Sequence, residues 1–110
     1  MAMPHAPVPL ACRLEGLAAA ERGRRAELHR GLRAALQESR ELPDGWAFRL
    51  PATTQAILEA AEWIALERRC CPFLDFALAS EVDGGVWLRV TGGAGVKAFV
   101  AAAMGAAAAP

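Results

Sequence analysis

The sequence lacks an excess of charge of either sign. Its 110 residues include 12 lysines and arginines and 12 aspartates and glutamates, so the formal net charge at pH 7 is +0. Proteins that bind nucleic acids or anionic membranes usually carry a basic excess. We therefore expect neither nucleic acid nor a membrane as a partner. Basic residues are dense between positions 17 and 38, but the glutamates among them favour an ordinary solvated helix face.

Long hydrophobic runs are also missing. No segment reaches the roughly 18 consecutive apolar residues that a membrane span requires. The first residues, MAMPHAPVPLAC, contain three prolines and no basic stretch ahead of an apolar run. This is not the pattern of a secretory signal peptide. We therefore expect a cytoplasmic protein.

Cysteine and histidine are scarce, with three and two residues respectively. A disulfide framework uses an even number of cysteines, so three fit a reducing compartment better. His5 lies in the proline-rich start of the chain, and nothing in the sequence brings His29 near a cysteine. The sequence therefore offers no clear base for a cysteine nucleophile.

The length and the apolar content predict one domain with a real core. Hydrophobic residues make up 55% of the chain, although alanine inflates this value. We expect a disordered N-terminal tail over residues 1–7, a single domain over residues 8–104 and a frayed, alanine-rich tail over residues 105–110.

Hydrophobic periodicity predicts an α+β fold. Strands are expected near residues 10–15, 46–50, 73–82 and 86–92, and helices near residues 17–38, 54–69 and 96–104. The order is β-α-β-α-β-β-α. The simplest packing is one largely antiparallel four-stranded sheet covered by helices, a ferredoxin-like two-layer sandwich.

Local signals define the second predicted helix. Thr53 or Thr54 caps its start, and Pro72 disfavours helical geometry at Cys71, so the helix ends near the cysteines. Its expected core stripe consists of Ile57, Ala61, Ile64 and Ala65.

A glycine-rich turn, TGGAGV, precedes the last predicted helix. It lacks the Gly-Lys-Ser/Thr ending of a phosphate loop. We therefore predict a plain strand-to-helix turn and no cofactor-binding residues.

The stretch ALERRCCPFLDF gathers the chain's most reactive side chains. Each helical residue turns about 100°, so Trp63, Glu67 and Cys70 share one stripe. Glu67 also lies one turn before Cys71, beside both thiols. Cys12 is expected in the first strand, and it joins this group only if that strand lies near the second helix.

Four chemistries are open to these cysteines. A Cys70–Cys71 disulfide would be strained, because adjacent Cα atoms lie about 3.8 Å apart and disulfides usually span about 4.4–6.8 Å. A nucleophilic or redox thiolate at Cys70 is disfavoured by the C-terminal helix dipole, while nearby arginines oppose that effect.

The third chemistry is binding of a thiophilic metal or metalloid. Thiolates select soft ions, and Cys12, Cys70 and Cys71 would suit an ion of low coordination number. Zn(II) would need a fourth ligand, from Glu67 or water. In the fourth, the cysteines simply pack as small hydrophobic residues.

The runs ACRL, LPDGWAFRL, WIALERRCCPFLDFAL and GGVWLRVTGGAGVKAFV together resemble an uncharacterised family of small bacterial proteins. Its mark is a Glu-x-x-Cys-Cys-x-Phe motif, here Glu67 to Phe73, with a hairpin and a glycine-containing turn after it. The resemblance extends over residues 10–104, and Cys12 matches a cysteine of the family's first strand. It implies the predicted architecture and points to the three cysteines, but it names no reaction.

The leading hypothesis is a non-enzymatic protein that binds Zn(II), Cu(I), Hg(II) or As(III). The expected metal-site residues are Cys12, Cys70, Cys71 and Glu67. The alternatives are a thiol redox or nucleophilic enzyme that uses Cys70, and a scaffold or homodimerisation domain whose cysteines only pack.

Overall fold

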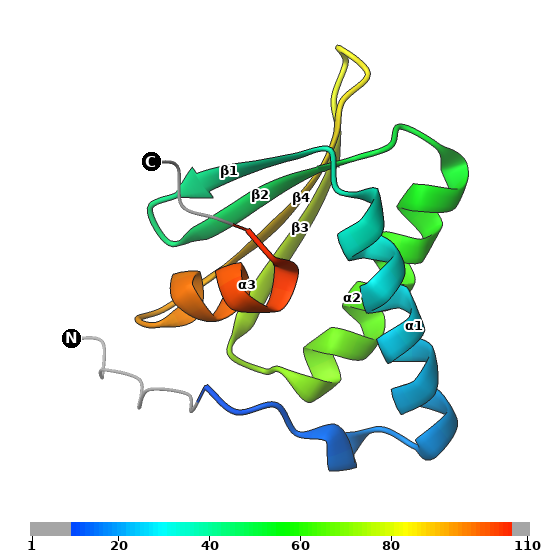
Figure 1. Cartoon of the computed structure of the whole chain (residues 1–110), viewed down its shortest axis with the longest axis vertical. Helices are drawn as coiled ribbons and strands as arrows, with labels where there is room; N and C mark the ends of the chain where they lie inside the picture. Colours follow the sequence, from blue (N-terminus) through cyan, green and yellow to red (C-terminus); the bar gives the residue numbers. More distant parts are fainter. Residues whose placement is uncertain (1–9, 107–110) are drawn as a thin grey trace, which may run out of the picture.

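The computed structural model describes residues 10–106, which form three α-helices, four strands and one short 3-10 helix (Figure 1). In chain order the elements are η1 (Leu14–Gly16), α1 (Ala19–Ala35), β1 (Glu38–Leu42), β2 (Gly45–Leu50), α2 (Thr54–Cys70), β3 (Leu74–Ser80), β4 (Val86–Gly92) and α3 (Val96–Met104). The predicted tail over residues 1–7 lies outside the described residues, as do residues 107–110 of the predicted C-terminal tail.

The four strands form one antiparallel sheet in the order β1-β2-β4-β3. The α+β class and the four-stranded antiparallel sheet covered by helices are therefore confirmed. Two tight turns, at Pro43-Asp44-Gly45 and Asp83-Gly84-Gly85, connect β1 to β2 and β3 to β4. Strands β2 and β4 are central, which explains why their sequences are mostly buried.

The predicted first strand at residues 10–15 is wrong. This segment is irregular and enters η1 at Leu14. Its Arg13 backbone N–H bonds to the carbonyl oxygen of Cys70 at the end of α2 instead of to a neighbouring strand. A short apolar run forms a strand only where a sheet edge accepts its backbone groups.

The fourth strand of the sheet is β1, which follows α1 and was not predicted from the sequence. The segment Glu38–Leu42 reads ESREL, and four of its five residues are exposed. Because β1 lies at an edge of the sheet, it shows no hydrophobic alternation. The order of the main elements is therefore α-β-β-α-β-β-α. The ferredoxin-like description, which denotes a β-α-β-β-α-β order, is not confirmed.

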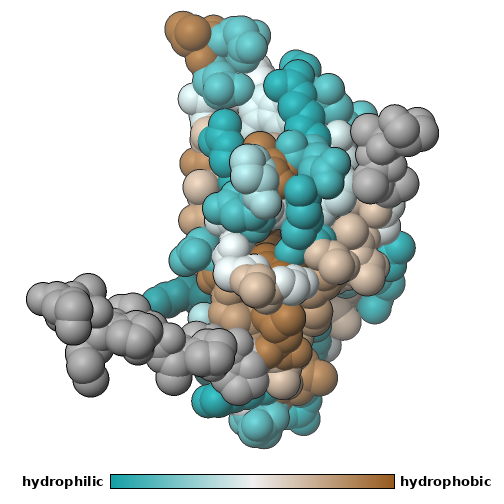
Figure 2. Space-filling view, turned by 90° about the vertical axis from the view of Figure 1, so that its left-hand side faces the viewer, coloured by the Kyte–Doolittle hydropathy of each residue, from teal (hydrophilic) through white to brown (hydrophobic). Residues whose placement is uncertain are grey.

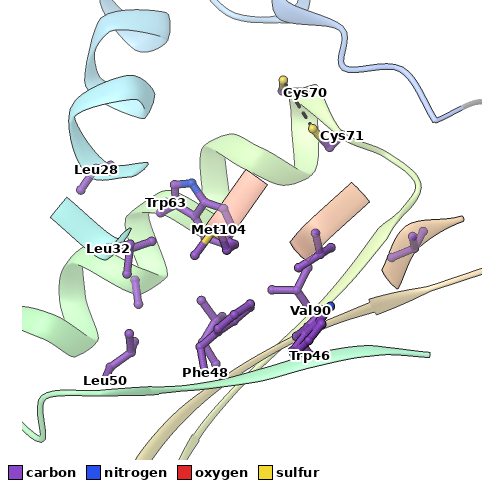
Figure 3. Packing of buried hydrophobic residues seen from close by; sticks show 14 of the residues in the cluster. Leu28, Leu32, Trp46, Phe48, Leu50, Trp63, Cys70, Cys71, Val90 and Met104 are labelled. Carbon is purple, nitrogen blue, oxygen red and sulfur yellow. Dashed lines mark hydrogen bonds between the residues drawn. The ribbon is translucent and has the colours of Figure 1, made fainter. Parts of the chain in front are cut away.

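The core lies between the inner face of the sheet and the three helices (Figure 3). The inner face of β2 consists of Trp46, Phe48 and Leu50, all at most 2% exposed. Leu28 and Leu32 of α1 approach this layer, with Trp63 of α2 and Met104 of α3 (Figure 3). Burying such side chains stabilises the fold by roughly 1.5–3 kcal/mol each.

Helix α2 buries a different stripe from the one expected. The buried residues are Ala60, Trp63, Glu67 and Cys70, whereas Ala61 and Ala65 are exposed. Thr53 caps the helix as predicted, because its side chain accepts a hydrogen bond from the Ala56 backbone N–H at 3.1 Å. The helix thus carries the stripe with Glu67 and Cys70 into the interior.

The surface differs in polarity between its parts. Figure 2 shows hydrophilic side chains over much of the upper part of one face and hydrophobic ones in its lower part, at the level of α3 in Figure 1. None of the helices in the described part of the chain combines the length and the apolar character of a membrane span.

Candidate thiol metal site

The site begins at the C-terminal end of α2. Cys70 is the last helical residue, and Cys71 is the C-cap, whose backbone N–H donates to the Glu67 carbonyl oxygen at 2.7 Å. Pro72 follows directly, so the chain leaves the helix here, as predicted. Both cysteines are 0% exposed (Figure 3).

The irregular N-terminal segment brings the third cysteine to this helix end. Arg13 donates its backbone N–H to the Cys70 carbonyl oxygen at 2.6 Å. Further along, the Arg69 guanidinium donates to the Gly16 carbonyl oxygen at 2.9 Å. These two contacts hold the segment on either side of η1, and they bring Cys12 to the cysteine pair.

The structure brings together all four residues that the sequence suggested. The sulfurs of Cys12, Cys70 and Cys71 and a carboxylate oxygen of Glu67 lie within 4.8 Å of one another. The Cys70 and Cys71 sulfurs are 3.8 Å apart. Cys12 is exposed, while the other three side chains are buried. The position of Cys12, which the sequence left open, is thereby established.

Cys12 and Cys71 also form a pair at disulfide distance, with Cα atoms 4.7 Å apart and a sequence separation of 59. This Cα separation falls within the usual disulfide range, unlike that of adjacent cysteines. Cys70 remains a free, buried cysteine. A disulfide at this site therefore joins Cys12 to Cys71, and not the two neighbouring residues.

Glu67 is held by Arg25, a partner that the sequence did not suggest. Arg25 donates from Nε to Oε2 at 2.7 Å and from Nη2 to Oε1 at 2.9 Å. The Glu67 side chain is only 5% exposed, and that of Arg25 is 20% exposed. A lone glutamate on a helix is usually solvated and paired with a neighbouring arginine. The partner of Glu67 lies instead 42 positions away on α1, so no local pattern could reveal it.

The electrostatics of Cys70 disfavour its thiolate. Burial raises the pKa of the Cys70 thiol, and the Glu67 carboxylate raises it further, although Arg25 acts in the opposite direction. The reduced thiol is therefore protonated at neutral pH. This agrees with the expectation that the C-terminal end of a helix does not activate a cysteine strongly.

The thiol nearest to the Glu67 carboxylate is that of Cys71. The Cys71 sulfur lies 3.0 Å from Oε1 of Glu67, close enough for its thiol to donate to that oxygen when Cys71 is reduced. The same oxygen accepts from Nη2 of Arg25. One carboxylate therefore joins α1 to the sulfur cluster.

A small cavity of about 50 Å³ lies next to the Arg25–Glu67 pair. Its polar lining consists of Arg25, His29, Trp63 and Glu67. The His29 ring stacks on Trp63 with centroids 6.5 Å apart, and its Nε2 lies 2.9 Å from the Ala103 carbonyl oxygen. Burial lowers the pKa of His29, so the neutral ring donates from Nε2 to that carbonyl. Trp63 thus packs in the interior, between α1 and the sheet.

This arrangement supports two kinds of chemistry. Three sulfurs within reach of one another form a donor set for a soft ion. The Cys12–Cys71 pair is alternatively placed to form a disulfide, which removes two of the three donors. The two states exclude each other, because a sulfur in a disulfide is no longer a thiolate ligand.

Comparison of the chain with protein-family models, with curated proteins and with solved structures gave no match. The resemblance based on the Glu67 to Phe73 motif therefore stays a prediction.

Proposed function

We propose that the protein binds a thiophilic metal or metalloid ion through Cys12, Cys70 and Cys71. The observation that carries the proposal is the convergence of these three sulfurs and the Glu67 carboxylate within 4.8 Å. They come from two segments far apart in sequence, the N-terminal segment and the end of α2. Simple packing of small hydrophobic residues does not require three thiols at one point.

The spacing of the sulfurs suits one shared ion. With metal–sulfur bonds of about 2.3 Å, three sulfurs around one ion lie about 4 Å apart. The 3.8 Å between the Cys70 and Cys71 sulfurs matches this spacing. The Cys12 sulfur can take up the same distance when Cys12 and Cys71 are reduced, because its segment is irregular and its side chain is exposed.

The proposed activity requires reduced thiols. Ion binding deprotonates cysteines, and the ion itself supplies the driving force for losing those protons, so the raised pKa of Cys70 does not prevent ligation. A reducing compartment such as the cytoplasm, the predicted location, keeps Cys12 and Cys71 from forming a disulfide.

Titration of the reduced protein with As(III), Hg(II), Cu(I) and Zn(II) tests the proposal. We expect 1:1 binding tighter than micromolar for at least one ion. Replacing any one of the three cysteines by serine should weaken that binding. Binding that survives replacement of all three cysteines, or absence of binding, would exclude the proposed function.

A thiol redox centre is the second candidate, and the Cys12–Cys71 distance favours it. Two thiols would give two electrons and two protons to an oxidant such as hydrogen peroxide, which would leave as two waters while the S–S bond forms. The Cys12–Cys71 pair would carry this reaction, because burial raises the pKa of the Cys70 thiol. Rapid cycling between dithiol and disulfide with no ion binding would favour this candidate.

A scaffold or homodimerisation domain is the third candidate. It predicts that serine at all three cysteine positions changes neither ion content nor redox behaviour. The same variants therefore separate all three candidates.

A further inference from the structure

Both oxygens of the Glu67 carboxylate already have a partner within the candidate site. Two parallel N–H groups of Arg25 occupy both of its oxygens, at 2.7 and 2.9 Å. The Cys71 sulfur lies 3.0 Å from Oε1, close enough to donate to it when Cys71 is a free thiol. Bidentate pairs between arginine and carboxylate are among the strongest hydrogen-bonded contacts in proteins. Breaking one in a buried setting leaves an uncompensated charge.

We infer that Arg25 determines the ion specificity of the site by holding Glu67 out of the coordination shell. The inference rests on the proposed function and specifies its ligand class. The site then offers three sulfurs and no oxygen. It is therefore suited to ions that complete their shell with three thiolates, with As(III) as the clearest case.

Zn(II) is disfavoured by the same arrangement. Protein zinc sites are usually four-coordinate. In the described part of the chain, the cluster able to hold an ion contains only Glu67 besides the three cysteines. A fourth protein ligand for Zn(II) would therefore require Glu67 to leave Arg25. Glu67 stays instead outside the shell, held by Arg25, with its Oε1 atom 3.0 Å from the Cys71 sulfur.

The reaction of arsenite with the three thiols needs no added base, oxidant or reductant. As(OH)₃ reacts with three thiols to form three As–S bonds and release three waters. Each hydroxide leaves with the proton of the thiol that replaces it, and no group is oxidised or reduced.

The test compares As(III) and Zn(II) affinities of the reduced wild type, Glu67→Gln, Arg25→Gln and the double variant. We expect Glu67→Gln to change the ratio of the Zn(II) and As(III) affinities less than threefold, since no ligand of either ion is lost. Arg25→Gln should free the carboxylate and tighten Zn(II) binding roughly tenfold, the order of effect seen for outer contacts of metal ligands. The double variant should lose this gain, because the freed carboxylate is gone.

The outcomes separate this inference from the proposed function. A tenfold or greater loss of Zn(II) affinity relative to As(III) affinity in Glu67→Gln would show that Glu67 is a ligand of Zn(II), and would overturn the inference while ion binding stands. Glu67→Gln keeps the arginine, so it still distinguishes a ligand from an outer partner if Arg25→Gln does not fold. Failure of the wild type to bind any of the ions would overturn the proposed function, and the inference with it.

Discussion

The backbone N–H of Arg13 donates to the carbonyl oxygen of Cys70 at 2.6 Å, although the two residues lie far apart in sequence. This bond satisfies an otherwise free carbonyl at the end of α2. It also places Cys12, one residue earlier, beside the two cysteines at the end of the helix. The three-sulfur cluster is therefore a consequence of how one helix end is capped.

The first prediction concerns the second anchor of the N-terminal segment. Arg69 donates to the Gly16 carbonyl and pairs with Glu21 at 2.6 Å. Arg69→Ala should release the segment, speed the alkylation of Cys12 several-fold and weaken ion binding. The free energy of unfolding should change little, because solvent screens this surface pair.

Arg68→Ala is the matched control for Arg69→Ala. Arg68 is the neighbouring exposed arginine, and its side chain makes no hydrogen bond or ion pair within residues 10–106. It should leave Cys12 alkylation unchanged. Equal effects of the two variants would mean that the segment is not held by Arg69. Alkylation is followed by mass spectrometry after a short pulse of iodoacetamide.

The second prediction concerns the buried Arg25–Glu67 pair. Arg25→Gln should lower the free energy of unfolding by about 3–5 kcal/mol, because it leaves a buried carboxylate without its cation. Chemical denaturation with urea measures this change.

Arg24→Gln provides the control for that measurement. Arg24 also joins α1 to α2 through two hydrogen bonds, to Glu62 at 2.8 Å each, but these side chains are 39% and 44% exposed. Its removal should therefore lower the free energy of unfolding far less than the removal of Arg25. Similar costs for the two arginines would mean that burial does not strengthen the Arg25–Glu67 pair.

The third prediction concerns oxidation. Treatment with hydrogen peroxide should link Cys12 to Cys71, lower the mass by two hydrogens and stabilise the fold by about 2–4 kcal/mol through closure of a long loop. Cys70→Ser should form the same link, whereas Cys71→Ser should not. A Cys70–Cys71 link in peptide mapping would contradict the assignment.

The fourth prediction concerns acid. The pKa of His29 is lowered in the folded state by burial, so the unfolded chain binds the proton more readily. Above about pH 6.5, the usual pKa of histidine, His29 is neutral in both the folded and the unfolded chain. As the pH falls below this value, the unfolded chain takes up the proton first, so the folded state loses stability. Denaturation midpoints between pH 7 and pH 5 should therefore decrease. His29→Gln, which cannot take up the proton, should flatten this dependence, and an unchanged slope would show that His29 is not the group responsible.

Much of this fold could be predicted because its signals are local. Residues of β2 and β4 alternate between the core and the outer face, and the hairpin turns carry their usual residues. The same logic failed for β1, whose side chains are polar on both faces. It failed at residues 10–15 because apolar residues alone do not reveal that the backbone caps a helix.

The residues of the site could be predicted from the sequence, but the ion pair that holds Glu67 could not. The spacing of Trp63, Glu67 and Cys70 placed them on one stripe, and the structure confirms that they are buried together. The sequence assigned the core stripe to a neighbouring set that includes Ala61 and Ala65, because a buried glutamate is rare without a partner. That partner, Arg25, becomes visible only when α1 packs beside α2.

The central claim is that one ion is held by three sulfurs and by no carboxylate. X-ray absorption at the arsenic edge of the reduced, arsenite-loaded protein tests it most directly. We expect three As–S contacts and no As–O contact, with the same spectrum in Glu67→Gln. A remaining As–O contact, or fewer than three As–S contacts, would contradict the claim.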